Sequence, residues 1–234
     1  MIGPRLALSI LLGLGLLSTA GPPSEAWAQT SEPPVYKPPL RGAPQGRVGG
    51  ATRGAAENLP KLEILAPDHV GHTTAEQPVL YWFVSKPVLA KLQVTVASEK
   101  SIKPEIEIDI GQPVVPGVQT FSLAAHGLKL KPDVDYEFSV ALVTNPAERS
   151  SDLMASGIVR RVSVLPGVAD EAAKLPALPR SAALAERGIW YDALMVLGDA
   201  IAARPDDRSL RLGRAALLDQ VGLGEVAAFE RQRP

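Results

Sequence analysis

The sequence predicts a mainly β protein, an antiparallel sandwich of two sheets followed by a small C-terminal α-helical segment. Two observations predict this fold class. Between Leu62 and Leu165, short runs of alternating apolar and polar residues are separated by prolines, which is typical of strands joined by turns. After Pro166, the apolar residues recur at helical spacing instead. We therefore divide the chain into a signal peptide (1–28), a flexible Pro/Gly/Arg-rich arm (29–58), a β-sandwich domain (59–166) and an α-helical segment (167–234).

The signal peptide predicts export to the periplasm or out of the cell. Arg5 supplies its positive charge, and the apolar run Leu6–Ala20 has about 15 residues, which is short for a membrane span. The residues Ala26, Trp27 and Ala28 supply the small-x-small pattern that signal peptidase cleaves. A retained membrane anchor is the alternative. After cleavage we expect no stable membrane span.

The composition argues against several functions. The chain has no cysteine, so disulfides, thiolate chemistry and a lipid anchor on an N-terminal cysteine are excluded. The formal net charge of −1 argues against nucleic acid as a partner, because nucleic-acid-binding domains usually carry a basic excess. The hydrolase motifs G-x-S-x-G and H-E-x-x-H are also missing. We expect no enzyme activity and no cofactor.

The arm contains the stretch RGAPQGRVGGATRG, in which Arg41, Arg47 and Arg53 stand six residues apart among glycines. A phosphate loop needs G-x-x-x-x-G-K-[ST] between a strand and a helix, and this stretch lacks that pattern. Two interpretations remain. The arm is either a solvated linker, which its glycines favour, or a segment whose arginines bind an anionic partner. We retain the three arginines as candidate binding residues.

Seven short strands without intervening helices indicate the antiparallel sandwich. They are Leu62–Ile64, Val79–Val84, Lys91–Ala97, Glu105–Ile110, Phe121–Leu123, Tyr136–Leu142 and Ile158–Val164. Glu105, Glu107 and Asp109 share one face of the fourth strand. We interpret them as the solvated face of an edge strand, in preference to the paired acids of a glycosidase.

His69 and His72, with Asp68 beside them, are predicted to lie in a turn. A metal site would need a third converging ligand, which the sequence does not indicate, so we favour a surface loop and expect no metal. The RSSD stretch (149–152) falls in the connection between the last two strands. It is either a polar recognition loop or an ordinary turn.

One motif narrows the type of sandwich. The stretch LKPDVDY (130–136), followed by an alternating strand, resembles the tyrosine corner of fibronectin type III and related immunoglobulin-like domains. In those domains the tyrosine hydroxyl returns to the backbone a few residues upstream. Trp82 lies where they often have a core tryptophan. The resemblance implies an immunoglobulin-like or fibronectin type III-like sandwich.

The helical segment shows a repeat. Gly188 and Gly222 are 34 residues apart, as are Ala193 and Ala227, which is the period of tetratricopeptide repeats. Two partial repeats are fewer than such arrays need alone, so we expect the segment to dock on the sandwich.

The stretch GIWYDA has the densest aromatic content of the chain. Trp190, Tyr191 and Asp192 are candidate binding residues, because they could form a ligand platform. The alternative, which we favour, is a turn between helices with Trp190 in the core, since aromatics at helical spacing mostly pack.

Three stretches taken together, RGAPQGRVGGATRG, RSSD and GIWYDAL, resemble an exported bacterial family known as domain of unknown function 928. The resemblance extends from about Pro38 to Leu223 and implies no activity. It suggests that the arm docks, for example as a strand along a sheet edge. We expect a non-catalytic binding or scaffold module of the cell envelope whose partner is an envelope protein or an anionic polymer. The alternatives are an envelope glycan hydrolase and a small-ligand sensor with a pocket between sandwich and helices.

Overall fold

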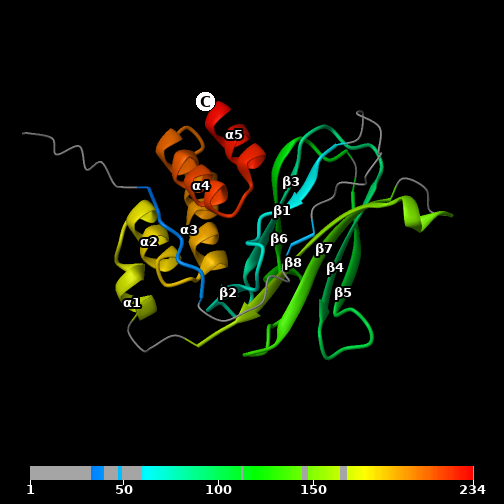
Figure 1. Cartoon of the computed structure of the whole chain (residues 1–234), viewed down its shortest axis with the longest axis horizontal. Coiled ribbons are helices and arrows are strands. Elements are labelled where there is room, and N and C mark those ends of the chain that lie inside the picture. Colours follow the sequence, from blue (N-terminus) through cyan, green and yellow to red (C-terminus); the bar gives the residue numbers. More distant parts are fainter. Residues whose placement is uncertain are drawn as a thin grey trace, which may run out of the picture. The chain divides into compact units, whose positions relative to one another are not determined.

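A computed structural model describes residues 33–39, 47–48, 60–111, 113–143, 147–163 and 168–233 of the chain. In these residues the strands precede the α-helices (Figure 1). The strands within these ranges are β1 (Leu62–Ile64), β2 (Gly71–Thr73), β3 (Val79–Val84), β4 (Lys91–Ser98), β5 (Ile106–Ile110), β6 (Gly117–Ser122), β7 (Asp135–Val143) and β8 (Leu153–Arg161). The α-helices are α1 (Val168–Ala173), α2 (Ala177–Ala185), α3 (Trp190–Ala203), α4 (Arg208–Gln220) and α5 (Gly224–Gln232). The fold is therefore mixed. The predicted signal peptide lies outside the described residues.

The strands form two sheets, one in the order β1-β3-β6 and the other in the order β2-β8-β7-β4-β5. The pairs are antiparallel except for β2 and β8, which run parallel with Gly71 opposite Val159. The sequence predicts neither β2 nor a parallel pair, because Gly-His-Thr shows no apolar alternation. His72 consequently lies in a strand and not in the predicted turn.

Aromatic rings join the two sheets across their buried faces. The ring centroid of Phe138 in β7 lies 6.4 Å from that of Trp82 in β3 and 6.1 Å from that of Phe121 in β6. The backbone of Gly157 in β8 packs closely against Ala66, because a Cβ added at Gly157 would lie 2.7 Å from the Cβ of Ala66. The core of the strand region therefore lies between the sheets.

The LKPDVDY motif and the acidic strand β5 have the contacts and exposure that the sequence predicts. The hydroxyl of Tyr136 accepts a hydrogen bond from the backbone N–H of Lys131 at 3.2 Å, which is the return contact that the LKPDVDY motif predicts. This bond fixes the start of β7 against the preceding turn. Strand β5 forms one edge of the larger sheet, and Glu107 and Asp109 on it are exposed, as predicted for an edge face.

The helices form two hairpins with the same turn. Gly188 lies between α2 and α3, and Gly222 lies between α4 and α5, and both have a φ of 74°. Glycine favours this left-handed conformation because it has no Cβ. Within the second hairpin, Arg214 and Glu230 form a buried ion pair with 2.7 Å between Nη2 and Oε2. The 34-residue spacing in the sequence therefore corresponds to a repeated backbone turn.

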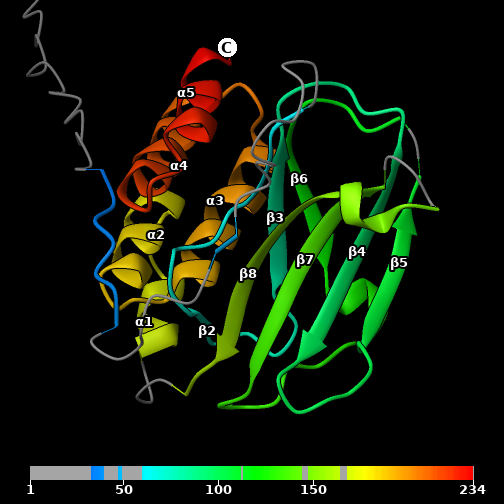
Figure 2. The ribbon, with the colours of Figure 1, turned by 45° about the vertical axis from the view of Figure 1, so that its right-hand side comes forward.

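The helical segment docks on the strands through α3 and α5, which confirms the predicted docking. Gly198 of α3 lies against Tyr81 of β3, where an added Cβ would overlap the tyrosine hydroxyl. Phe229 of α5 meets Phe83 of β3 edge to face, with 5.1 Å between ring centroids. Figures 1 and 2 show the helices gathered on one side of the strands, with β4 and β5 farthest from them.

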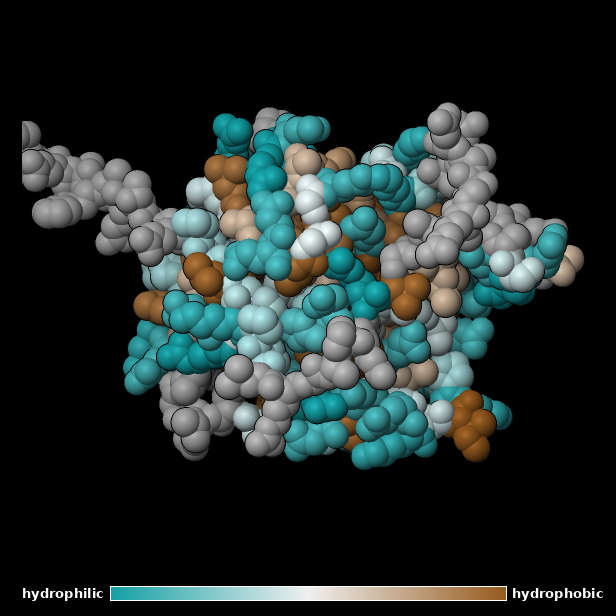
Figure 3. Space-filling view, viewed as in Figure 1, coloured by the Kyte–Doolittle hydropathy of each residue, from teal (hydrophilic) through white to brown (hydrophobic). Residues whose placement is uncertain are grey.

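The face of the molecule shown in Figure 3 is mostly polar, and its apolar residues are scattered rather than gathered into one patch. Away from the core, Leu89 and Ile102 are largely exposed. Among the residues that the structure describes, no helix has both the length and the apolar character that a membrane span requires.

Candidate functional site

A cavity of about 360 Å³ lies where the arm, the β1–β2 connection and the α4–α5 turn meet. We call it the arm cavity. Its lining residues are Tyr36, Pro38, Arg47, Asp68, His69, Gln220, Val221 and Gly222. The arm, the β1–β2 connection and the end of α4 therefore all contribute polar side chains to one cavity.

Residues 33–39 of the arm are bound to the helices through their main chain. Oε1 of Gln220 accepts the N–H of Tyr36 at 2.8 Å, and Nε2 of Gln220 donates to the carbonyl of Pro34 at 2.8 Å. The N–H of Lys37 donates to the carbonyl of Ala185 at 3.1 Å. In Figure 2 this segment, drawn in blue, runs alongside α2. The arm composition predicts mobility, but these hydrogen bonds depend on distant residues that composition does not reveal.

Tyr36, His69 and Asp68 form a hydrogen-bonded row at the cavity. The hydroxyl of Tyr36 lies 2.8 Å from Nε2 of His69, and Nδ1 of His69 lies 3.0 Å from Oδ1 of Asp68. Burial, with a smaller contribution from the charge of Asp68, raises the pKa of Tyr36 above its ordinary value of 10.0. The hydroxyl therefore stays protonated at neutral pH and can donate to Nε2, while Nδ1–H donates to Asp68. This order suits an anchoring role better than a nucleophile.

Two aromatic rings pack against Tyr36 beside the cavity. The ring of Tyr36 stacks on that of His69 with 5.8 Å between centroids. The indole of Trp190 meets the ring of Tyr36 edge to face, with 4.9 Å between ring centroids. As a result Tyr36 is only 7 % exposed, although it is the single aromatic residue between Gln29 and Asn58.

Arg47 reaches the cavity from the second described part of the arm. Its Nη1 donates to the carbonyls of Ala66 at 3.1 Å and Val221 at 2.9 Å. Burial lowers the pKa of the guanidinium, and the charges of Glu63 and Asp68 oppose that effect. Arginine nevertheless remains protonated at neutral pH. In the described ranges no carboxylate forms an ion pair with it.

Val48, next to Arg47, pairs with the strand region. Its N–H donates to the carbonyl of Ser156 in β8, and its carbonyl accepts the N–H of Ser156, both at 3.0 Å. This antiparallel bridge is the type of contact expected if the arm adds to a sheet edge. It also fixes the backbone beside Arg47. Arg41 and Arg53, the other candidate binding residues of the arm, lie outside the described residues.

The structure does not place Trp190, Tyr191 and Asp192 on a surface platform. All three are buried, with exposures of 0 %, 1 % and 5 %. The indole N–H of Trp190 donates to the carbonyl of Leu65 at 2.9 Å, and the hydroxyl of Tyr191 donates to that of Ile158 at 3.1 Å. These residues join α3 to the strands, because their polar atoms are bonded to strand and turn residues.

Asp192 completes this junction from the first turn of α3. Its carboxylate accepts the N–H of Thr74 at 3.0 Å and the hydroxyls of Thr73 and Thr74. A buried carboxylate is tolerated when several donors satisfy it. The packing interpretation of GIWYDA therefore agrees with these contacts.

Sequence reasoning did not identify Tyr36, His69 and Gln220 as one site. They are far apart in the chain, so no local spacing predicts their meeting. The one available signal was the isolated aromatic Tyr36 in an otherwise aromatic-free arm. In the described part of the chain no group of three or more His, Cys, Asp or Glu side chains could hold a metal ion.

A family model described as Domain of Unknown Function (DUF928) matches residues 48–230, which is most of the chain. The chain belongs to the DUF928 family. No curated protein matches it. The DUF928 range begins at Val48 and includes Asp68, His69 and Gln220, so the walls that the β1–β2 connection and the helices give the arm cavity lie within it. Tyr36 and Arg47, which the arm contributes, precede that range.

Proposed function

We propose that this DUF928 member is an exported, non-catalytic binding module of the bacterial cell envelope. Its contact site is the arm cavity, and its partner is an envelope protein or an anionic polymer. The observation that carries the proposal is the half-buried guanidinium of Arg47, bonded to two main-chain carbonyls and, within the described residues, to no carboxylate.

The proposed scaffold is an immunoglobulin-like or fibronectin type III-like sandwich with a tetratricopeptide-like helical segment. Two sheets of mostly antiparallel strands support the first part of this proposal. The hydrogen bond between Lys131 and Tyr136 supports it further. The identical turns at Gly188 and Gly222 support the second part, because tetratricopeptide repeats have a period of 34 residues.

An anchored guanidinium suits an anionic group. Since Nη1 of Arg47 is bonded to the main chain, the side chain is positioned before a partner arrives. The planar guanidinium then offers its other N–H groups to a carboxylate or a phosphate. A hydrogen bond to a charged group contributes about 1.5–3 kcal/mol. Arg41 and Arg53 add to the positive charge of the arm.

Two alternatives use the same cavity. A small-ligand sensor is supported by the convergence of Tyr36, His69 and Arg47 at the junction of strands and helices. A glycan hydrolase needs a carboxylic acid of raised pKa in the cleft. Burial does raise the pKa of Glu63, but Glu63 does not line the cavity. We therefore place the hydrolase last.

Cosedimentation of the mature protein with isolated cell envelopes tests the proposed function. The test variant is Arg47→Gln. The matched control is Arg187→Gln, because Arg187 is an exposed arginine that also donates to a main-chain carbonyl. We expect Arg47→Gln to weaken binding about tenfold or more, since one charge-assisted contact is lost. Equal binding by the two variants contradicts the role of Arg47. Release of soluble glycan fragments contradicts a non-catalytic module.

Export is tested separately by N-terminal sequencing of the protein recovered outside the cytoplasm. We expect Gln29 as its first residue, because cleavage is predicted after Ala28. A recovered chain that still begins at Met1 contradicts a cleaved signal peptide.

A further inference from the structure

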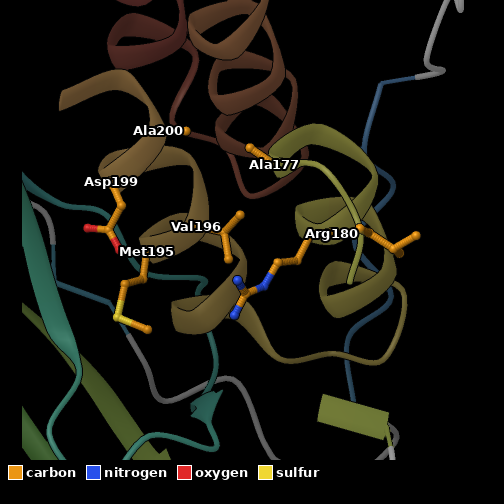
Figure 4. Close-up of a pocket in the computed structure, with 7 residues that line it drawn as sticks. Ala177, Arg180, Met195, Val196, Asp199 and Ala200 are labelled. Atoms are coloured by element: carbon orange, nitrogen blue, oxygen red, sulfur yellow. The ribbon is translucent and has the colours of Figure 1, made fainter. Parts of the chain in front are cut away.

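A second cavity, of about 340 Å³, lies between α2 and α3 and shares no lining residue with the arm cavity. We call it the helix cavity. It is lined by Leu175, Ala177, Arg180, Met195, Val196, Asp199 and Ala200 (Figure 4). Its volume is at the small end of the range of roughly 300–1,000 Å³ that is usual for small-molecule sites.

Two opposite charges face the helix cavity from different helices. Figure 4 shows Arg180 reaching toward α3 from α2, and Asp199 and Met195 on one side of α3. Within the described residues, the two side chains form neither an ion pair nor a hydrogen bond with each other or with another group. Opposite charges that share a cavity without pairing can each bind a charged group of a ligand.

One buried atom of the half-buried Arg180 points to a ligand independently. Its Nε atom is buried and has no hydrogen-bond partner among the described residues. A buried donor without an acceptor is destabilising, and such groups are rare in folded proteins. A bound carboxylate would satisfy this donor and the rest of the guanidinium together.

The remaining surface of the helix cavity is apolar. Val196 is 9 % exposed, and Ala177, Ala200 and Met195 line the same cavity. Small alanines leave room beside the two charges, and methionine adapts to ligands of different shape. The cavity therefore offers one cationic group, one anionic group and an apolar wall.

We propose that the helix cavity binds a free α-amino acid with an apolar side chain. The ligand carboxylate bonds to Arg180, its ammonium bonds to Asp199, and its side chain packs against Val196 and Met195. Asp199 is exposed and Arg180 half-buried, and a ligand with a single charge would use only one of them, so a zwitterion complements the cavity better. This proposal is independent of the one made for the arm cavity.

Isothermal titration calorimetry of the mature protein with L-leucine tests the proposal. Two analogues serve as controls: 4-methylpentanoate lacks the ammonium group, and 3-methylbutylamine lacks the carboxylate. We expect saturable binding of one leucine per chain, and each analogue to bind about tenfold more weakly or worse. Absence of saturable leucine binding, or equal binding of an analogue, overturns the proposal.

Variants of Arg180 and Asp199 test which side chain binds the ligand carboxylate and which binds its ammonium group. Arg180→Gln and Asp199→Asn should each weaken leucine binding about 10- to 100-fold, whereas the exposed control Arg187→Gln should leave it unchanged. Arg180→Gln should leave the weak binding of 3-methylbutylamine unaltered, because that analogue has no carboxylate. Leucine binding that neither Arg180→Gln nor Asp199→Asn weakens overturns the proposal.

A second measurement on the unaltered protein keeps the proposal testable if a variant fails to fold. Only two methionines follow the signal peptide, Met195 in the helix cavity and Met154 on β8. With methyl-labelled methionine, leucine should shift the NMR signal of Met195 and leave that of Met154 in place. A shift of Met154 alone, or of neither signal, overturns the site.

Discussion

The first helical hairpin, α2–α3, and the second, α4–α5, share a turn but meet the strands in different ways. Gly188 and Gly222 both adopt a φ of 74°. After the glycine, the first hairpin continues with Ile-Trp-Tyr-Asp and the second with Leu-Gly-Glu-Val. The backbone turn is thus repeated, while the side chains that follow it are not.

The contacts of these side chains show the consequence. Trp190, Tyr191 and Asp192 are buried and bonded to strand and turn residues. At the corresponding positions of the second hairpin, no described atom lies within 4 Å of a Cβ added at Gly224, and Glu225 forms an exposed ion pair. The comparison teaches that small residues at the repeat positions specify the hairpin, whereas three large or charged side chains give the first hairpin a buried, hydrogen-bonded junction with the strands that the second lacks at these positions.

The largest expected effect is the loss of the tryptophan that ties down the first hairpin. Trp190→Ala should lower the free energy of unfolding by about 3–5 kcal/mol, because it removes a fully buried ring and its bond to Leu65. The counterpart Phe229→Ala in α5 should cost less, since Phe229 is only partly buried. Urea denaturation measures both losses. Equal losses would mean that the two hairpins dock equally strongly.

A smaller loss of stability is expected when either turn glycine, Gly188 or Gly222, is replaced. Gly188→Ala and Gly222→Ala should each cost about 1–2 kcal/mol in unfolding free energy, because alanine is strained in the left-handed conformation. Gly188→Ala should cost more, since its Cβ would lie 3.0 Å from the carbonyl of Lys37, whereas at Gly222 the nearest atom is Nη2 of Arg47 at 3.6 Å. Denaturation of both variants checks this order. In a chain that begins after Pro39 the two losses should become similar, and a persisting difference would exclude the arm as its cause.

The smallest expected effect is a pH dependence at β2, the strand on which α3 packs. Burial lowers the pKa of His72 below its ordinary value of 6.5, with Arg160 and His69 acting in the same direction and Asp135 and Asp133 opposing. The unfolded chain therefore binds the proton more readily than the folded one. The contribution of neutral His72 is complete above pH 6.5 and is lost as the pH falls through 6.5 toward the lower folded pKa.

Denaturation between pH 7 and pH 5 measures this effect, and His72→Gln is the control. The slope from His72 should stay below about 1.4 kcal/mol per pH unit, because one proton sets that limit and the side chain is half-buried. His72→Gln should flatten the profile. If His72→Gln leaves the pH profile unchanged, any loss of stability in acid comes from other groups.

Most strands could be predicted from the sequence, because one buried face imposes an alternating pattern on each of them. Strand β2 could not, since its three residues gain their place from hydrogen bonds to β8 and carry no pattern. The sequence predicted that Trp190 packs in the core, but it did not predict that the indole bonds to the carbonyl of Leu65. The arm cavity could not be predicted, because Tyr36 and Gln220 are 184 residues apart and their contact leaves no local signal.

The sequence by itself determined that strands precede the α-helices, the edge character of β5, the Tyr136 contact and the repeated glycine turn. Each of these follows from neighbouring residues, whose side chains must match a strand face or a backbone conformation. Only the tertiary structure decided that Tyr36 meets His69 in a cavity that Arg47 also lines, that GIWYDA ties α3 to the strands, and that Arg180 and Asp199 line one cavity. Those outcomes depend on how separate elements pack, and packing brings together residues that have no fixed spacing in the chain.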